Sequence, residues 1–155
     1  MKTTLFATLF TILAGSSAFG QKQLGVFDAV KLNDSTTLEM CLNHGLKANT
    51  TRIDGSTLLM EASKNGSYAS AKILLAHGAK VNAKNDLGNT ALMEATLRGD
   101  AQMVNMLLQA GANTTIVNEV GETALTIAEG FEKTAIAQLF NNKSQHTKDE
   151  YAKIR

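Results

Sequence analysis

The sequence repeats itself at a fixed interval of 33 residues, and this period constrains the fold more than any other feature. The best-formed unit spans residues 86–116, DLGNTALMEATLRGDAQMVNMLLQAGANTTI, and its pattern also occurs 33 positions earlier. The coinciding positions are Gly55 and Gly88, Thr57 and Thr90, Leu59 and Leu92, Met60 and Met93, Glu61 and Glu94, Ala62 and Ala95, Gly66 and Gly99, Leu74 and Leu107, Leu75 and Leu108, Gly78 and Gly111, and Ala79 and Ala112. Such self-similarity indicates a stacked array of structural repeats.

Each unit contains the signals for two short helices. Thr90 precedes an apolar run and can accept hydrogen bonds from the first free backbone N–H groups of a helix. The residues that then recur with the spacing of one helix face are Leu92, Met93, Ala95 and Thr96. Gly99 ends this helix, and the apolar side of the next one carries Met103, Val104, Met106, Leu107 and Leu108. Gly111 ends the second helix, where a left-handed backbone is sterically free only for glycine.

The pattern G-x-T-x-L-M-x-A, followed by a glycine and then by L-L-x-x-G-A, resembles the ankyrin repeat. The tetratricopeptide repeat has a similar period, but the Gly-Ala pair after the second helix argues against it. The resemblance implies an all-α repeat solenoid of about four ankyrin-type helix-turn-helix repeats with short protruding hairpin turns. We place these repeats at about residues 23–53, 54–85, 86–118 and 119–143, in one domain spanning residues 21–143.

The sequence departs from the family pattern in two ways. The usual T-P-L-H is altered, and methionine stands in the histidine position at Met60 and Met93, so we expect methionine packing in place of a threonine–histidine hydrogen bond. The first and last repeats are degenerate, as terminal repeats commonly are because one face meets water. We expect the last repeat to end in a capping helix around residues 133–141.

Residues 1–20 have the layout of a secretory signal peptide. Lys2 supplies a positive start, residues 5–14 a short apolar run, and Ala18, Phe19 and Gly20 a small-residue cleavage site. The alternative is a buried first helix, but this segment lacks the landmarks of the repeat. We therefore expect an exported protein, periplasmic or secreted, with a charged C-terminal tail at residues 144–155 that is a frayed helix or disordered.

The charge balance argues against two classes of partner. Removing residues 1–20 takes away only Lys2, which reduces the 15 basic residues to 14 and matches the 14 acidic ones. A neutral, mixed surface gives no electrostatic reason to expect nucleic acid or, after signal cleavage, a membrane as partner. We expect a monomer. Its fold must be held together by packing alone, because a single cysteine cannot form an internal disulfide.

Few side chains suggest chemistry, and we predict no catalytic residue, metal or cofactor. Cys41 and His44 could pair a thiolate with an imidazole, but Cys41 occupies an apolar slot of the repeat and is expected to be a small buried hydrophobe. His44 and His77 each precede a closing glycine, and adjacent repeats about 10 Å apart hold them too far from each other to share a metal. Glu61 and Glu94 are expected to be solvated positions on the first helices.

The resemblance implies a non-enzymatic protein-binding module. In the ankyrin family, partners usually meet the concave side, which is formed by the hairpin tips and the exposed positions of the first helices. Transferred to this sequence, the tip residues are Thr51, Ile53, Asp54 and Ser56, then Lys84, Asp86, Leu87 and Asn89, then Val117, Glu119, Val120 and Glu122. The first-helix positions are Lys64, Asn65, Leu97 and Arg98, with Phe131 as a further candidate.

This predicted surface is partly apolar. Ile53, Leu87 and Val120 recur at or next to one tip position, and Leu97 lies beside Arg98. Apolar residues and an arginine within a polar ring suit a protein interface better than a small-molecule pocket. The alternative is that these side chains pack one tip against the next.

By analogy, small exported bacterial proteins similar to this one look like accessory or protective partners of an exported enzyme. Such enzymes include detoxifying haem enzymes such as catalase. An immunity or inhibitor protein that blocks a toxin or hydrolase is the second hypothesis. An enzyme in its own right is the third hypothesis, although the sequence contains no assembled active site.

Overall fold

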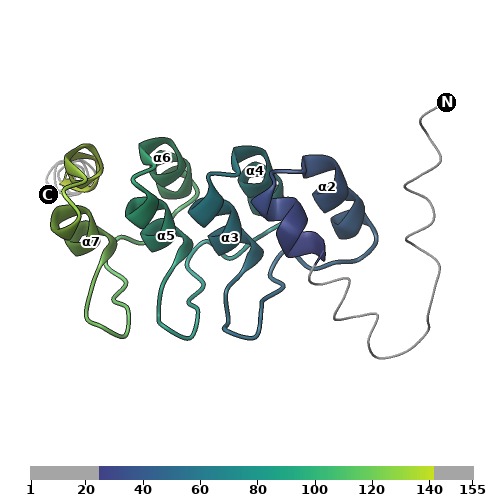
Figure 1. The fold of residues 1–155 in the computed structure, drawn as a ribbon, viewed down its shortest axis with the longest axis horizontal. Helices are drawn as coiled ribbons and strands as arrows, with labels where there is room; N and C mark the ends of the chain where they lie inside the picture. The colour runs from purple at the N-terminus through teal and green to yellow at the C-terminus, as the bar shows by residue number, and fades with distance from the viewer. Residues whose placement is uncertain (1–24, 142–155) are drawn as a thin grey trace, which may run out of the picture.

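The computed structural model describes residues 25–141 as a stack of helix pairs with hairpin turns protruding from one edge (Figure 1). Its labelled helices are α2 (Ser35–Asn43), α3 (Leu58–Asn65), α4 (Tyr68–Ala76), α5 (Ala91–Arg98), α6 (Ala101–Gln109) and α7 (Ala124–Gly130), with further helical residues at 25–31 and 134–141. Helices α3, α5 and α7 form one layer and α2, α4 and α6 the other, so the predicted all-α repeat solenoid is confirmed. The predicted signal peptide and C-terminal tail lie outside the described residues.

The first helix of each later repeat begins at a threonine. The side-chain oxygens of Thr57, Thr90 and Thr123 accept from the backbone N–H three residues later, at 3.2, 3.4 and 3.2 Å. In repeat two the reverse bond has a sulfur acceptor: the Thr57 N–H donates to Sδ of Met60 at 3.4 Å. Met60 and Met93 are both buried in the core, in agreement with the expected methionine packing.

The second helices end at left-handed glycines, as the sequence predicts. Gly78 and Gly111 follow α4 and α6 with φ of +76° and +88°. The first helices end at a second left-handed position that recurs through the whole stack. This position is held by Asn33, Gly66, Gly99 and Glu132, with φ of +55°, +69°, +80° and +55°. The degenerate terminal repeats therefore keep the backbone geometry of the central ones with other residues in place of glycine.

One continuous core runs from the first described helix to the last. Buried apolar side chains extend from Val26 to Phe140, and each repeat contributes to the contact with its neighbour. Helix α5 packs against both α3 and α7, while α2 packs against α4. The predicted capping helix is present at residues 134–141, where Ile136 and Phe140 are buried.

Two asparagines 33 residues apart fasten repeat one to repeat two and repeat two to repeat three on the side of the second helices. The Asn49 side chain accepts from the N–H of Lys80 at 2.7 Å and donates to the carbonyl of Gly78 at 3.2 Å. Asn82 makes the same two bonds to Asn113 and Gly111, at 2.8 and 3.3 Å. The helix-ending glycine of one repeat is thus held by the asparagine of the repeat before it.

Within residues 25–141, no helix has the length and apolar character needed to cross a lipid bilayer.

Candidate protein-binding surface

Each hairpin turn is closed by the same backbone hydrogen bond. The donor N–H and acceptor carbonyl pairs are Arg52 and Ser56 at 2.9 Å, Asn85 and Asn89 at 3.0 Å, and Asn118 and Glu122 at 2.9 Å. Within the described chain the turns carry no named strand, only an isolated antiparallel bridge between Thr51 and Thr57. Three sequence-distant turns therefore share one closed shape.

Side-chain oxygens hold the tips of these turns. In the second turn, Oδ1 of Asn85 accepts from the N–H of Leu87 at 3.1 Å and of Asn89 at 2.9 Å. Asn118 repeats this arrangement with Val120 and Glu122 in the third turn. The first turn has arginine at the equivalent position, and Oδ1 of Asp54 accepts from the N–H of Ser56 at 3.0 Å instead. This bond holds the pKa of the Asp54 carboxyl below its usual range.

Neighbouring turns are joined to each other by their backbones. The N–H of Asp86 donates to the carbonyl of Asp54, and the N–H of Glu119 donates to the carbonyl of Leu87, both at 3.0 Å. The approach is close, because a Cβ placed on Gly88 would lie 2.9 Å from Cα of Asn118. The three turns thus form one connected structure, which we call the tip row and define as residues 51–56, 84–89 and 117–122.

Aliphatic side chains stand exposed along the tip row. Relative exposure is 105% for Ile53, 65% for Leu87 and 77% for Val120, and Val117 is 46% exposed. The turns are joined by backbone groups and by polar side chains, while these aliphatic side chains remain exposed. Packing of tip against tip therefore does not account for the aliphatic residues.

The predicted first-helix positions are less uniform. Lys64 is exposed and Leu97 is 38% exposed, but Asn65 is half-buried and donates to the Oε1 atom of Glu61 at 2.9 Å. Arg98 lies across Gly66, where its guanidinium is 3.0 Å from the place a Cβ would occupy. It also donates to the carbonyl of Lys64 at 3.3 Å. Arg98 therefore takes part in packing between repeats two and three.

A family model for ankyrin repeats in three copies matches residues 26–118, which is more than half of the chain. The chain belongs to the ankyrin-repeat family. Ankyrin repeats are protein-binding modules and are typically non-enzymatic. A comparison with curated proteins found no match.

The other predicted surface residues of this ankyrin-repeat protein are polar members of the tip row itself. Asn89 accepts at Oδ1 from Nδ2 of Asn118 at 3.0 Å, and Nζ of Lys84 donates to the carbonyl of Val117 at 3.0 Å. The exposed residues are Thr51, Asp54, Lys84, Asp86 and Glu119, and the half-buried ones are Ser56, Asn89 and Glu122. Several of these polar groups hold one turn against the next.

The expectation that Glu61 and Glu94 are solvated is wrong, because both side chains are partly buried between adjacent repeats. Glu61 pairs with Arg52 at 3.2 Å, and its side chain is only 12% exposed. Arg52 in turn lies 4.5 Å above the ring of Phe27. Burial raises the pKa of the Glu94 carboxyl, an effect that the positive charge of Lys64 opposes.

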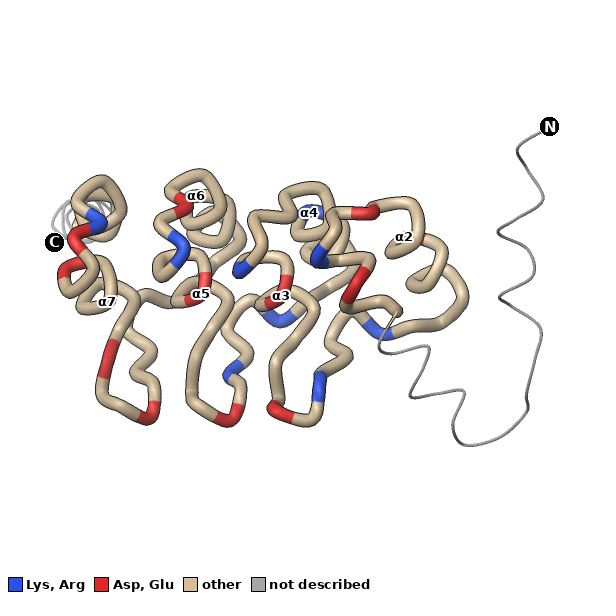
Figure 2. Tube along the Cα trace, viewed as in Figure 1, with Lys and Arg blue, Asp and Glu red and all other residues tan. Residues whose placement is uncertain are grey.

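Charge along the tip row is predominantly acidic at the outermost positions (Figure 2). Asp54, Asp86 and Glu119 are exposed, one on each of the three turns. The two cations of the row make contacts within the protein. Arg52 forms an ion pair with Glu61, and Lys84 donates to the carbonyl of Val117. The chain is nearly neutral as a whole, yet this edge presents negative charge.

Some residues that shape the surface were absent from the sequence prediction. Arg52, Asn85 and Asn118 hold the turns, and the 33-residue spacing of the two asparagines was a signal that could have identified them. Tyr68 and Asp100 connect repeats two and three, because the tyrosine hydroxyl donates to both carboxylate oxygens at 2.8 Å. This bond raises the pKa of Tyr68.

The residues considered for chemistry lie apart from the tip row. His44 and His77 are the C-cap residues of α2 and α4, as expected for helix-end histidines. Cys41 is only partly buried against the core, so the expectation of a small buried hydrophobe holds in part. No group of three or more His, Cys, Asp or Glu side chains in residues 25–141 is placed to hold a metal ion.

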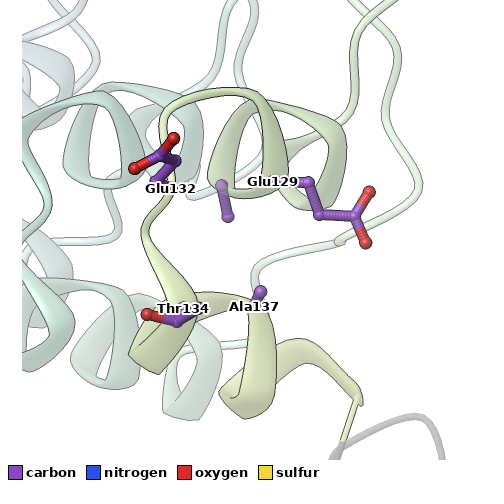
Figure 3. Close-up of a pocket in the computed structure, with 5 residues that line it drawn as sticks. Glu129, Glu132, Thr134 and Ala137 are labelled. Carbon is purple, nitrogen blue, oxygen red and sulfur yellow. The ribbon is translucent and has the colours of Figure 1, made fainter.

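A shallow hollow of about 450 Å³ lies at the C-terminal end of the stack (Figure 3). It is lined by Ala128, Glu129, Glu132, Thr134 and Ala137. Figure 3 shows the two carboxylates directed away from each other. Glycosidase-type chemistry uses two carboxylates that flank one bond, and these two side chains are not arranged in that way.

Proposed function

We propose that this ankyrin-repeat protein binds another protein through its tip row and the adjoining exposed first-helix residues. The observation that carries the proposal is the line of exposed aliphatic side chains at Ile53, Leu87 and Val120, held on a hydrogen-bonded backbone. Exposed apolar side chains within a polar surround are typical of interfaces and lose contact with water when a partner covers them.

We further propose that the protein is exported and acts as a monomer in the periplasm or outside the cell, as an accessory or protective partner of another exported protein. The support is the signal-peptide layout of residues 1–20, together with the analogy to small exported accessory proteins. An exported enzyme, such as a catalase, is the kind of partner that this analogy favours.

The first experiment is affinity capture from a periplasmic extract of the source cells, with the bound protein identified by mass spectrometry. The variant Leu87→Asp/Val120→Asp places two charges on the tip row, where both side chains are more than half exposed. We expect it to lose the partner and to keep its thermal melt. Leu32→Asp is the matched control, because Leu32 is 78% exposed and lies outside the tip row.

Capture that is equal for the wild type and the tip variant would contradict the proposed surface. The activity of the captured partner separates the two roles considered above. A partner enzyme that keeps or gains activity in the complex supports an accessory role, whereas one that is blocked indicates an inhibitor. Cell fractionation with an antibody tests export, and a purely cytoplasmic protein would refute it.

A further inference from the structure

Each tip of the row carries one aliphatic side chain beside one carboxylate. The pairs are Ile53 with Asp54, Asp86 with Leu87, and Glu119 with Val120, and all six residues are exposed. The order is aliphatic then acidic in the first turn and acidic then aliphatic in the other two. The same two chemical groups are therefore presented three times along one edge.

Among the described residues, the three outermost acids of the tip row lack an ion-pair partner, although the nearby charge of Arg52 contributes to the lowered pKa of Asp54. Within residues 25–141, none of Asp54, Asp86 and Glu119 takes part in an ion pair. Arg52 is paired with Glu61, and Lys84 donates to a carbonyl of the next turn. Lys64 is exposed, but it lies on α3 and not in a turn. The net charge at the tips is negative, most clearly at Asp86 and Glu119, and would favour a cationic partner.

The spacing of the tips follows from general backbone and helix geometry. Each turn contributes two backbone segments, and hydrogen-bonded segments lie about 4.8 Å apart, so one turn occupies about 10 Å along the row. Packed helices give a similar interval, because neighbouring axes lie about 8–10 Å apart. The aliphatic–acidic pairs therefore recur at about 10 Å.

An α-helix matches this interval. Seven helical residues rise about 10.5 Å and complete nearly two turns, so side chains seven positions apart lie on one face at the spacing of the tips. On an extended strand, side chains of one face recur at about 6.7 Å and fall out of step. A nucleic acid carries the same charge sign as the tips and would be repelled.

We infer that the tip row receives an amphipathic helix of the partner protein whose lysine or arginine and aliphatic side chains recur every seven residues. The inference rests on the proposed function, because it assigns the chemistry of the partner at the same surface. The cations of the helix face Asp54, Asp86 and Glu119, and its aliphatic residues cover Ile53, Leu87 and Val120.

The test uses the full chain, expressed with its N-terminal segment so that any processing takes place, and three fluorescently labelled 21-residue helical peptides. The first carries Lys–Leu pairs every seven residues on an alanine- and glutamine-rich background. The second has the same composition with pairs every five residues, and the third has glutamate in place of each lysine. Fluorescence anisotropy at low salt measures the dissociation constants.

We expect the seven-residue peptide to bind more tightly than both of the others. Asp86→Asn/Glu119→Gln removes two exposed ion pairs, so it should weaken binding by about two- to thirtyfold. Added salt should reduce the difference. The matched control Glu39→Gln removes an exposed carboxylate from α2 and should leave binding unchanged.

Equal binding of the five-residue or the acidic peptide would overturn the inference, as would an unchanged affinity of the double variant. Absence of binding by all three peptides up to millimolar concentration would overturn it as well. These outcomes differ from failure of the proposed function. Partner capture that depends on Leu87 and Val120, with no peptide binding, refutes the helix and leaves the protein-binding surface in place.

Discussion

At the scale of single residues, the stack requires a left-handed backbone wherever a first helix ends. Gly66 and Gly99 adopt this conformation without steric cost, whereas Glu132 adopts it at φ of +55° with a side chain. Asn33 is compensated, because its Oδ1 accepts from the N–H of Ser70 at 3.1 Å. The left-handed residue of the last repeat is therefore strained, whereas the strain at the equivalent residue of the first repeat is offset by a hydrogen bond.

Glu132→Gly should accordingly stabilise the protein. A side chain in the left-handed region costs roughly 1–2 kcal/mol, and the extra freedom of glycine in the unfolded chain offsets about half of this. We expect the free energy of unfolding in urea to rise by up to about 1 kcal/mol. Glu129→Gly is the control, because Glu129 lies within α7 and the same change should destabilise there. A loss of stability in Glu132→Gly would contradict the strain.

Glu94 predicts a pH dependence. Burial raises its pKa above the ordinary value of 4.5, so the folded state binds more protons than the unfolded state between these two pKa values. The contribution of Glu94 to the free energy of unfolding is therefore fully present below pH 4.5. It is lost as pH rises through the pKa of the folded state. Glu94→Gln should flatten this decline and raise the melting temperature at pH 7. Equal slopes for variant and wild type, in melts from pH 4 to 8, would refute it.

At the scale of elements, the turns depend on glycine for two separate reasons. Gly88 and Gly121 both have positive φ, but only Gly88 lies against a neighbouring turn. Gly121→Ala should cost about 1–2 kcal/mol through backbone strain alone. Gly88→Ala should cost more, because its Cβ would also meet the backbone of Asn118. If urea denaturation gave the same loss in free energy of unfolding for both variants, the close approach of Gly88 to Asn118 would not contribute to stability.

The asparagine that fastens repeats two and three gives a further test. Asn82→Ala removes both of its hydrogen bonds, and we expect a loss of about 1–2 kcal/mol. Asn82→Asp keeps the acceptor for the Asn113 N–H and loses only the donor to the Gly111 carbonyl, so it should lose less. The two variants are compared by chemical denaturation, and the reverse order would contradict this assignment.

The period and the helix-ending glycines could be predicted from sequence, because both follow from local backbone chemistry repeated at equal spacing. The burial of Glu94 could not, since it depends on the side chains of the neighbouring repeat. The packing role of Arg98 was missed for the same reason. Its side chain contacts Gly66, and only the stacking of repeats brings these two residues together. The polar part of the candidate surface was therefore harder to predict than its exposed aliphatic tips.

At the scale of the whole molecule, each repeat is stabilised chiefly by its neighbours. Inserting a second copy of residues 86–118 after residue 118 would preserve the carbonyl and N–H that join consecutive turns. We expect the longer protein to melt at a higher temperature and to remain cooperative. Circular dichroism and calorimetry measure both properties, and a lower melting temperature or a second transition would contradict the nearest-neighbour account.

The hydrogen bonds from Asp86 to Asp54 and from Glu119 to Leu87 run along the length of the stack and join the outer edges of the turns. The relative positions of the tips are thus set when the chain folds. A partner meets a surface that needs little reordering, so association loses little conformational entropy on this side of the complex. Encounter and orientation, rather than a rearrangement of this protein, then govern the rate at which the complex forms.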